Sequence, residues 1–142
     1  RAWADFTPKP EVSKSQFGTL LALRHGGKCP SERKGERDPF EPMTLSVLAG
    51  IMEQSMPAVS QRISKLEAAG YVSRTPDEKD KRTIWIQLTP SGVELLQSSY
   101  QDMVREIGSI LEKMGQEDSE TLIRVLDKLA GVIEESVKEK HQ

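Results

Sequence analysis

Residues 55–62 place small and hydrogen-bonding side chains at the start of a predicted helix, a combination suited to contact with nucleic-acid bases. Gln61 has the donor and acceptor geometry to pair with adenine, and Arg62 has donors for guanine or a phosphate. Ser55 can cap this helix, and Pro57 is tolerated in its first turn. The segment is therefore predicted to read a major groove. The alternative for each of these side chains is an ordinary solvated helix surface.

A second polar cluster lies at the tip of a predicted β-ribbon and consists of Asp77, Lys79, Asp80, Lys81 and Arg82. The two aspartates can brace the ribbon and orient the Arg82 guanidinium, while the two lysines can meet phosphates. An arginine at such a tip can read the shape of a narrow minor groove. The alternative is that Asp80 and Arg82 form only a surface ion pair, worth about 0 to 1 kcal/mol.

Helices must position both clusters. Ser13 is predicted to cap a helix that runs to about His25 and stops at Gly26-Gly27, Thr44 to cap the next, and Gly70 to end the helix that begins at Ser55. Their apolar faces are expected to pack inward: Phe17, Leu20, Leu21 and Leu23; Leu45, Leu48, Ala49 and Met52; Val59, Ile63 and Leu66.

Two β-like segments are expected at residues 71–74 and 82–88. In the second, Ile84, Ile86 and Leu88 alternate with more polar neighbours, as in a half-buried strand. Trp85 faces outward in this register, where it is either exposed or packed on a neighbouring helix.

From Gly92 onward the apolar residues recur at helical spacing, first to Gly115 and then through a second helix capped by Asp118 or Ser119. The two stripes are Val93, Leu96, Tyr100, Met103, Val104, Ile107, Ile110, Leu111 and Met114, and Leu122, Ile123, Leu126, Leu129, Ile133 and Val137. Such long stripes have little to pack against in a small domain, which favours a homodimer. Packing within one chain is the alternative.

Six short motifs also occur in a characteristic order: Leu48-Ala49, Val59-Ser60, Leu66-Glu67, Gly70-Tyr71-Val72, Asp77-x-x-Asp80-x-Arg82 and Leu88-Thr89-Pro90-Ser91-Gly92. In this order they resemble the MarR (multiple antibiotic resistance regulator) family over roughly a third of the chain. The resemblance implies a mostly α fold with a small β-wing, in which a winged helix-turn-helix binds DNA. Two residues depart from the pattern: Glu53 stands where glycine is common, and Gln54 where an apolar residue is usual.

Carried onto this chain, the resemblance implies that double-stranded DNA is contacted by Pro57, Ala58, Ser60, Gln61, Arg62, Lys65, Lys79, Lys81 and Arg82. Asp77 and Asp80 would brace the wing. It also implies a homodimer. A two-fold dimer would place its reading helices about one DNA turn apart, so an inverted-repeat operator is expected, and a repressor is expected rather than an activator. A small phenolic or lipophilic effector would bind between the dimerisation helices and the winged domain, at a pocket that could be lined by Phe17, Leu21, His25, Met52 and Tyr100. Ordinary core packing is the alternative for these five residues.

The 142 residues are predicted to form a single domain. Residues 13–92 would be the winged helix-turn-helix core, with a loop insertion at 26–42, and residues 93–142 a helical dimerisation region joined by the N-terminal segment. The formal net charge is −2, but it is uneven: residues 56–90 hold 6 basic and 4 acidic side chains, whereas residues 91–142 hold 6 and 11. The positive charge thus lies where DNA contact is expected.

The loop at 26–42 is rich in glycine, proline and charge and reads as a solvated insertion. The alternative is that Lys28, Arg33, Lys34 and Arg37 make extra phosphate contacts. Cys29 is the single cysteine, which excludes an intramolecular disulfide and fits a reducing compartment. It is a candidate redox sensor without a visible partner. Apolar runs are too short to span a bilayer, and no secretion signal is visible, so a cytoplasmic protein without membrane partners is expected.

An enzyme is not expected. His25 and His141 are the two histidines, and the sequence contains no metal-ligand cluster and no glycine-rich phosphate loop, so neither a metal nor a cofactor is predicted. The main competing hypothesis is a winged helix that binds a protein instead of an operator.

Overall fold

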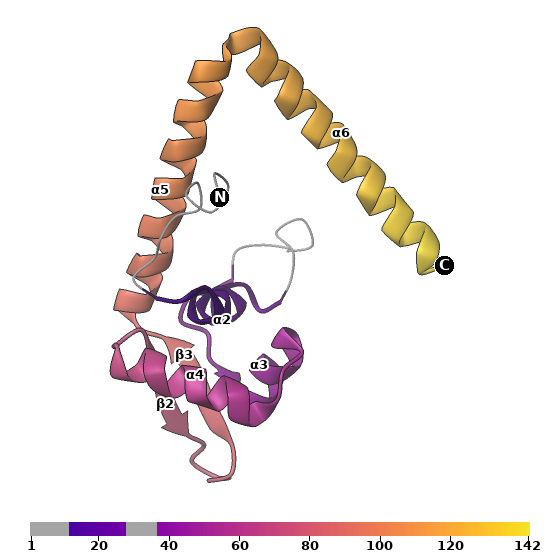
Figure 1. Cartoon of the computed structure of the whole chain (residues 1–142). Helices are drawn as coiled ribbons and strands as arrows, with labels where there is room; N and C mark the ends of the chain where they lie inside the picture. The colour runs from indigo at the N-terminus through magenta and orange to yellow at the C-terminus, as the bar shows by residue number, and fades with distance from the viewer. Residues whose placement is uncertain (1–11, 28–36) are drawn as a thin grey trace. The chain divides into compact units, whose positions relative to one another are not determined.

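The structure is a computed structural model that describes residues 12–27 and 37–142. The chain divides into two compact units, one ending at Gln101 and the other beginning at Asp102. The described residues of the first unit form three short helices, a small sheet and the start of a long helix (Figure 1). The predicted fold class, mostly α with a small β-wing, is confirmed.

The three short helices begin where the sequence places their capping residues. They are α2 (Lys14–His25), α3 (Leu45–Met52) and α4 (Met56–Ala68). Ser13, Thr44 and Ser55 each accept a hydrogen bond from a backbone N–H in the first turn of the helix that follows. These bonds satisfy donors that have no partner within the helix, so the predicted starts are confirmed.

The sheet has three antiparallel strands in the order β1-β3-β2. They are β1 (Met43–Thr44), β2 (Val72–Pro76) and β3 (Ile84–Leu88). β1 was not predicted, because two residues are too few to show alternation. β3 begins two residues later than predicted because the preceding residues belong to the turn, where the Thr83 N–H donates to the Asp80 carbonyl at 3.0 Å.

The core of the first unit lies between α2, α3, α4 and the sheet. Its buried apolar side chains are Leu20, Leu23, Met43, Leu48, Ala49, Val59, Ile63, Leu66, Val72, Ile86, Leu88 and Leu96. Leu21 was expected among them, but its side chain is 37% exposed. Helical geometry turns it onto the flank of α2, while the fully buried Thr19 satisfies its hydroxyl by donating to the Ser15 carbonyl.

Two long helices follow the sheet (Figure 1). They are α5 (Pro90–Met114) and α6 (Gln116–Lys140), separated by Gly115 with a φ of 90°. The predicted caps of the second helix, Asp118 and Ser119, were wrong because α6 begins directly after Gly115. The Ser119 hydroxyl instead donates to the Leu111 carbonyl at 2.6 Å and so satisfies an acceptor in the last turn of α5.

From Tyr100 onward the apolar stripes of these helices are largely open to solvent. α6 has no buried residue. The exposed apolar side chains are Tyr100, Met103, Val104, Ile107, Ile110 and Met114 on α5, and Leu122, Ile123, Val125, Leu126, Leu129, Val132, Ile133 and Val137 on α6. Within the described ranges, no helix combines the length and the apolar character that crossing a membrane requires.

Candidate nucleic-acid interface

α4 presents three distinct sides in the first unit. The side toward the core consists of Val59, Ile63 and Leu66, all fully buried. Opposite it lies an exposed ridge at a spacing of four residues, formed by Pro57, Gln61 and Lys65. Of the predicted reading residues on this helix, these three are the most open, because the side chains of Ala58, Ser60 and Arg62 are half-buried beside them.

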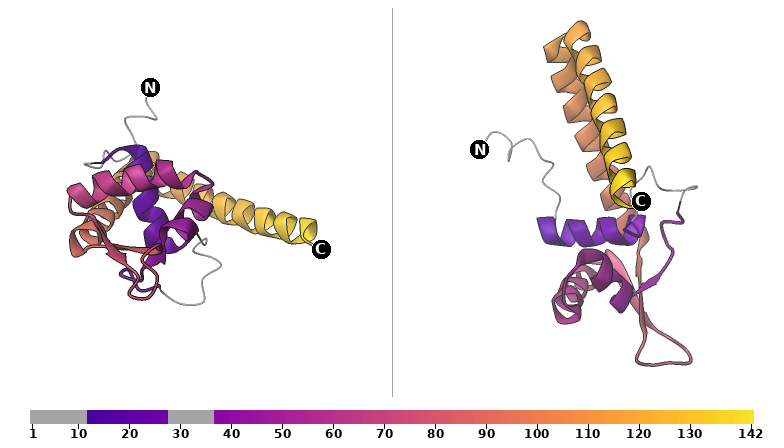
Figure 2. Two further views of the ribbon diagram at one scale, coloured as in Figure 1. Left: turned by 90° about the horizontal axis from the view of Figure 1, so that it is seen from below. Right: turned by 90° about the vertical axis from the view of Figure 1, so that its right-hand side faces the viewer.

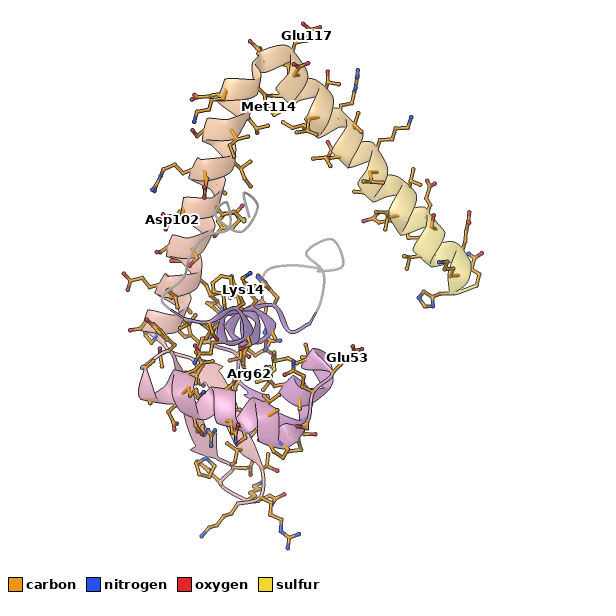
Figure 3. All side chains as sticks on the ribbon, in the orientation of Figure 1. Lys14, Glu53, Arg62, Asp102, Met114 and Glu117 are labelled. Carbon is orange, nitrogen blue, oxygen red and sulfur yellow. The ribbon has the colours of Figure 1, made fainter. Side chains whose placement is uncertain are left out.

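One flank of α4 is held by the turn that precedes it. Arg62 donates to the Gln54 side-chain oxygen and places its other terminal nitrogen 4.0 Å from the Met52 sulfur. Figure 3 labels Arg62 on α4 and Glu53 in the turn before it. In that turn Glu53 has a φ of 53° and is the one non-glycine residue with positive φ in the described part of the chain. The sequence pattern identified this position as one where glycine is common, and its left-handed backbone explains that preference.

The other flank of α4 is joined to β2 by Arg74, a residue that no motif in the sequence singles out. Its guanidinium Nη2 donates to the Ser60 carbonyl at 2.7 Å and to the Ser64 hydroxyl at 2.9 Å, and lies 3.4 Å from the Ser60 hydroxyl. Its backbone N–H donates to the Glu67 carboxylate at 3.2 Å. Arg74 therefore binds α4 over two successive turns along one face.

The turn between β2 and β3 is organised by two carboxylates. Asp77 accepts the backbone N–H groups of Lys79 and Asp80 at 2.9 and 3.1 Å, and its second oxygen accepts the Trp85 indole N–H at 2.9 Å. These bonds lower the pKa of Asp77, the indole N–H having the largest effect. The half-buried Trp85 is thus bonded to the wing turn through its indole N–H.

Asp80 accepts the backbone N–H of Arg82 at 3.0 Å and the Thr83 hydroxyl at 3.2 Å. The bonds described for both carboxylates go to the ribbon and not to the Arg82 guanidinium. The guanidinium is therefore not held by these carboxylates and lies at the surface. Lys79, Lys81 and Arg82 are all exposed. The ribbon that carries them extends beyond the helices of the first unit (Figure 2).

Arg82 shares a surface cavity of about 170 Å³ with the starts of α3 and α4. Its lining residues are Thr44, Leu45, Ser46, Met56, Arg82, Thr83 and Ile84. Residues distant in the sequence therefore lie on one surface: the wing arginine, the first turn of α3 and the first residue of the proposed reading helix.

The five residues suggested for an effector pocket differ in their exposure. Phe17, His25 and Met52 are half-buried, whereas Leu21 and Tyr100 are exposed, Tyr100 to 63%. Partial burial alone does not distinguish a pocket wall from the edge of a core.

The charged loop is described only at its two ends, residues 26–27 and 37–42. Lys28, Cys29, Arg33 and Lys34 lie outside the described residues, so the proposed phosphate contacts and redox role stay predictions. Arg37 is described: its Nε lies 3.4 Å from the Glu41 carboxylate and its Nη2 donates to the Glu41 carbonyl at 3.3 Å.

The segment that carries this surface is similar to known proteins. Residues 39–84, which include α3, α4 and the wing, match the family model "MarR family". Similar curated proteins include the HTH-type transcriptional regulator PecS of Dickeya dadantii, 26% identical over 121 residues, and the uncharacterized HTH-type transcriptional regulator YwhA of Bacillus subtilis, 28% identical over 73 residues. The alignments cover 85% and 51% of this chain but only 66% of PecS and 52% of YwhA.

The fold is shared with solved structures. A point mutant of S. aureus MepR, bound to an oligodeoxyribonucleotide, superposes with a TM-score of 0.64 at 21% identity, covering 87% of this chain and 80% of that one. At this identity the likeness establishes the arrangement of helices and wing.

Proposed function

Because this chain carries a MarR-family winged helix-turn-helix, we propose that it is a sequence-specific DNA-binding transcriptional regulator. The observation that carries the proposal is the combination of an exposed ridge on α4 with an exposed Arg82 on the wing, each on an element braced by its own hydrogen bonds. Base reading requires side chains held in a fixed geometry, and these bonds provide it.

In this proposal α4 enters the major groove. Gln61 stands at the centre of the ridge, where it would pair with a base edge, most favourably adenine. Lys65 follows one turn later and would neutralise a phosphate, while Pro57 and Ala58 let the start of the helix approach the bases closely. Arg62 would exchange its contact with Gln54 for a guanine or a phosphate.

The wing would contact the neighbouring minor groove and backbone. Arg82 would enter a narrow minor groove, where the negative potential is strongest, and Lys79 and Lys81 would bind phosphates. The bonds that Asp77 and Asp80 make to the ribbon support this role, because they hold the tip in one conformation while leaving the Arg82 guanidinium at the surface.

The protein would act as a homodimer through α5 and α6. On α6 the apolar side chains between Leu122 and Val137 are 37% to 53% exposed, which is unusual for so many large apolar residues of a soluble monomer. A two-fold axis would set the two α4 helices about 34 to 36 Å apart, one DNA turn, and predicts an inverted-repeat operator. Residues 93–142 would then be the dimerisation region of a single functional domain.

Repression would follow from occupancy of the operator, and a small phenolic or lipophilic effector would release it. The half-buried Phe17, His25 and Met52 are the candidate contacts in the first unit, together with the exposed Leu21 and Tyr100. Arg62 lies 4.0 Å from the Met52 sulfur, so a ligand that displaces Met52 would also disturb α4.

Selection of random duplex DNA by the purified protein tests the proposal. We expect an enriched inverted repeat whose affinity falls steeply with salt concentration. The matched control is the same selection with the double variant Gln61→Ala/Arg82→Ala, which should enrich nothing. No enrichment by the wild type, together with salt-insensitive binding to a protein partner, would instead support a winged helix that serves as a protein-interaction module.

A further inference from the structure

Arg74 is the link between the two elements that would touch DNA, and nothing in the proposed reading mechanism assigns it a role. It lies on β2, it is half-buried, and its Nη2 contacts α4 at Ser60 and Ser64. We infer that Arg74 is a positioning residue: it fixes α4 against the wing and orients the Ser60 hydroxyl as a hydrogen-bond donor toward DNA. The inference rests on the proposed DNA-reading function.

The positioning role of Arg74 follows from its hydrogen bonds to α4. Both its side chain and its backbone N–H bind α4, the side chain at Ser60 and Ser64 and the N–H at Glu67. These three partners fall on one face at helical spacing, next to the exposed ridge. The outer edge of β2 is therefore tied to α4, so that the angle between wing and helix depends on this side chain.

The role of the Ser60 hydroxyl as a donor follows from the hydrogen bonds that a hydroxyl group can make. A serine hydroxyl has one donor and two acceptor sites, whereas a guanidinium can only donate. Because Arg74 Nη2 lies 3.4 Å from the Ser60 oxygen, it can occupy an acceptor site, and the hydroxyl proton must then point elsewhere. In the bonds described, the Ser64 hydroxyl donates to the Ser60 carbonyl at 3.1 Å, but the Ser60 hydroxyl donates to no protein acceptor.

Ser60 lies beside the ridge of α4, so its hydroxyl proton would be available to the duplex. It could therefore donate to a phosphate oxygen or to a base acceptor such as a purine N7, while its second acceptor site stays open. Arg74 acts through this residue without itself touching DNA.

A double-mutant cycle on the selected operator separates this role from direct contact. Arg74→Lys keeps the charge but cannot bridge two hydroxyl groups in the same way, and should weaken binding about tenfold. Ser60→Ala should cause a similar loss. If Arg74 acts through Ser60, the double variant binds about as well as the weaker single variant, because the second change removes an interaction already lost. Arg105→Lys on the polar face of α5 is the matched control and should bind as the wild type does.

Two outcomes overturn the inference. Losses that multiply to about a hundredfold, with a reduced salt slope for the neutral variant Arg74→Gln, would mean that Arg74 binds a phosphate itself. Unchanged affinity in Arg74→Lys would mean that it has no role in reading. Should Arg74→Lys not fold, Ser64→Ala can replace it, because it removes one acceptor of Arg74 on the exposed helix surface. Ser64→Ala should weaken binding severalfold, and its loss in affinity should not add to that of Ser60→Ala.

A measurement without DNA distinguishes failure of this inference from failure of the proposed function. Amide hydrogen exchange within Val72–Pro76 should accelerate in Arg74→Lys and stay unchanged in Arg105→Lys. If the wild type selects no DNA, the proposed function fails and the donor role of Ser60 fails with it, but accelerated exchange would still support the positioning role of Arg74. Unchanged exchange in Arg74→Lys would contradict that role whether or not the protein binds DNA.

Discussion

The indole N–H of Trp85 on β3 donates to the Asp77 carboxylate at 2.9 Å, which ties the strand to the turn that carries the basic tip of the wing. The same carboxylate accepts two backbone N–H groups of that turn. One side chain therefore holds the returning strand and the tip together, and the position of Arg82 depends on it.

Removal of this link should loosen the wing in a pH-dependent way. The pKa of Asp77 is lowered in the folded protein, first by Trp85 and then by the backbone N–H groups of Lys79 and Asp80. A lowered carboxyl pKa means that the stabilisation is present at neutral pH and is lost as the pH falls below the ordinary carboxyl range into the folded pKa. The indole N–H resonance of Trp85 should therefore shift only in acid, and Asp77→Asn should abolish that acid transition. If the acid transition persists in Asp77→Asn, another titrating group causes it.

The wing arginine should contribute directly to DNA affinity. Arg82→Ala should weaken operator binding by about tenfold or more and reduce the salt slope by roughly one, because one cation no longer displaces counterions from the duplex. The oligomeric state should not change, which light scattering can verify. Arg105→Ala on α5 is the control, and equal losses in the two variants would show a general charge effect rather than a wing contact.

The left-handed turn before α4 should be a site of stored strain. Glu53→Gly should raise the free energy of unfolding by about 0.5 to 1 kcal/mol, since glycine adopts a φ of 53° without a steric penalty. Urea denaturation measures this change. Glu94→Gly, the same substitution at an exposed right-handed position of α5, should instead destabilise by about 1 kcal/mol. Destabilisation at both positions would contradict the strain assignment.

Gly92 should tolerate no side chain. A Cβ at this buried position would collide with the Tyr71 carbonyl oxygen, at the junction of the sheet with α5. Gly92→Ala should therefore destabilise the protein by about 2 to 4 kcal/mol, in the range of severe steric changes in a core. Gly50→Ala in α3 has open space around the new methyl group and should stabilise by up to about 1 kcal/mol. Thermal unfolding of the two variants provides the comparison.

The exposed stripe on α6 should hold the dimer together. Leu129 is 52% exposed in the single chain, and Leu129→Glu would place an unpaired charge in the proposed interface. We expect a monomer at micromolar concentration by analytical ultracentrifugation, with much weaker operator binding. Leu129→Met, which conserves volume, should remain dimeric. A dimeric Leu129→Glu variant would exclude this part of α6 from the interface.

Local chemistry explains which parts of the fold were predictable. Ser13, Thr44 and Ser55 cap helices through backbone groups three residues away, so their role is visible in the sequence itself. The core side of α4 was equally visible, because apolar side chains recur there at helical spacing.

Features that depend on distant partners were not predictable. The contact of Arg74 with Ser60 joins residues 14 positions apart, and no local pattern selects that arginine from the others. Ser119 looked like a helix cap, but the carbonyl at Leu111 is the acceptor that its hydroxyl reaches. Leu21 is apolar enough for the core, yet the rotation of α2 leaves it at the surface.

The three sides of α4 also bear on how this protein could acquire a new target. Its buried side sets stability and its flanks are engaged by Gln54 and Arg74, which leaves Pro57, Gln61 and Lys65 as the positions where substitution costs the fold least. In the proposed mechanism, sequence preference and thermodynamic stability are thus encoded by different residues of one helix. Retargeting by exchange of these three side chains would then not require redesign of the scaffold.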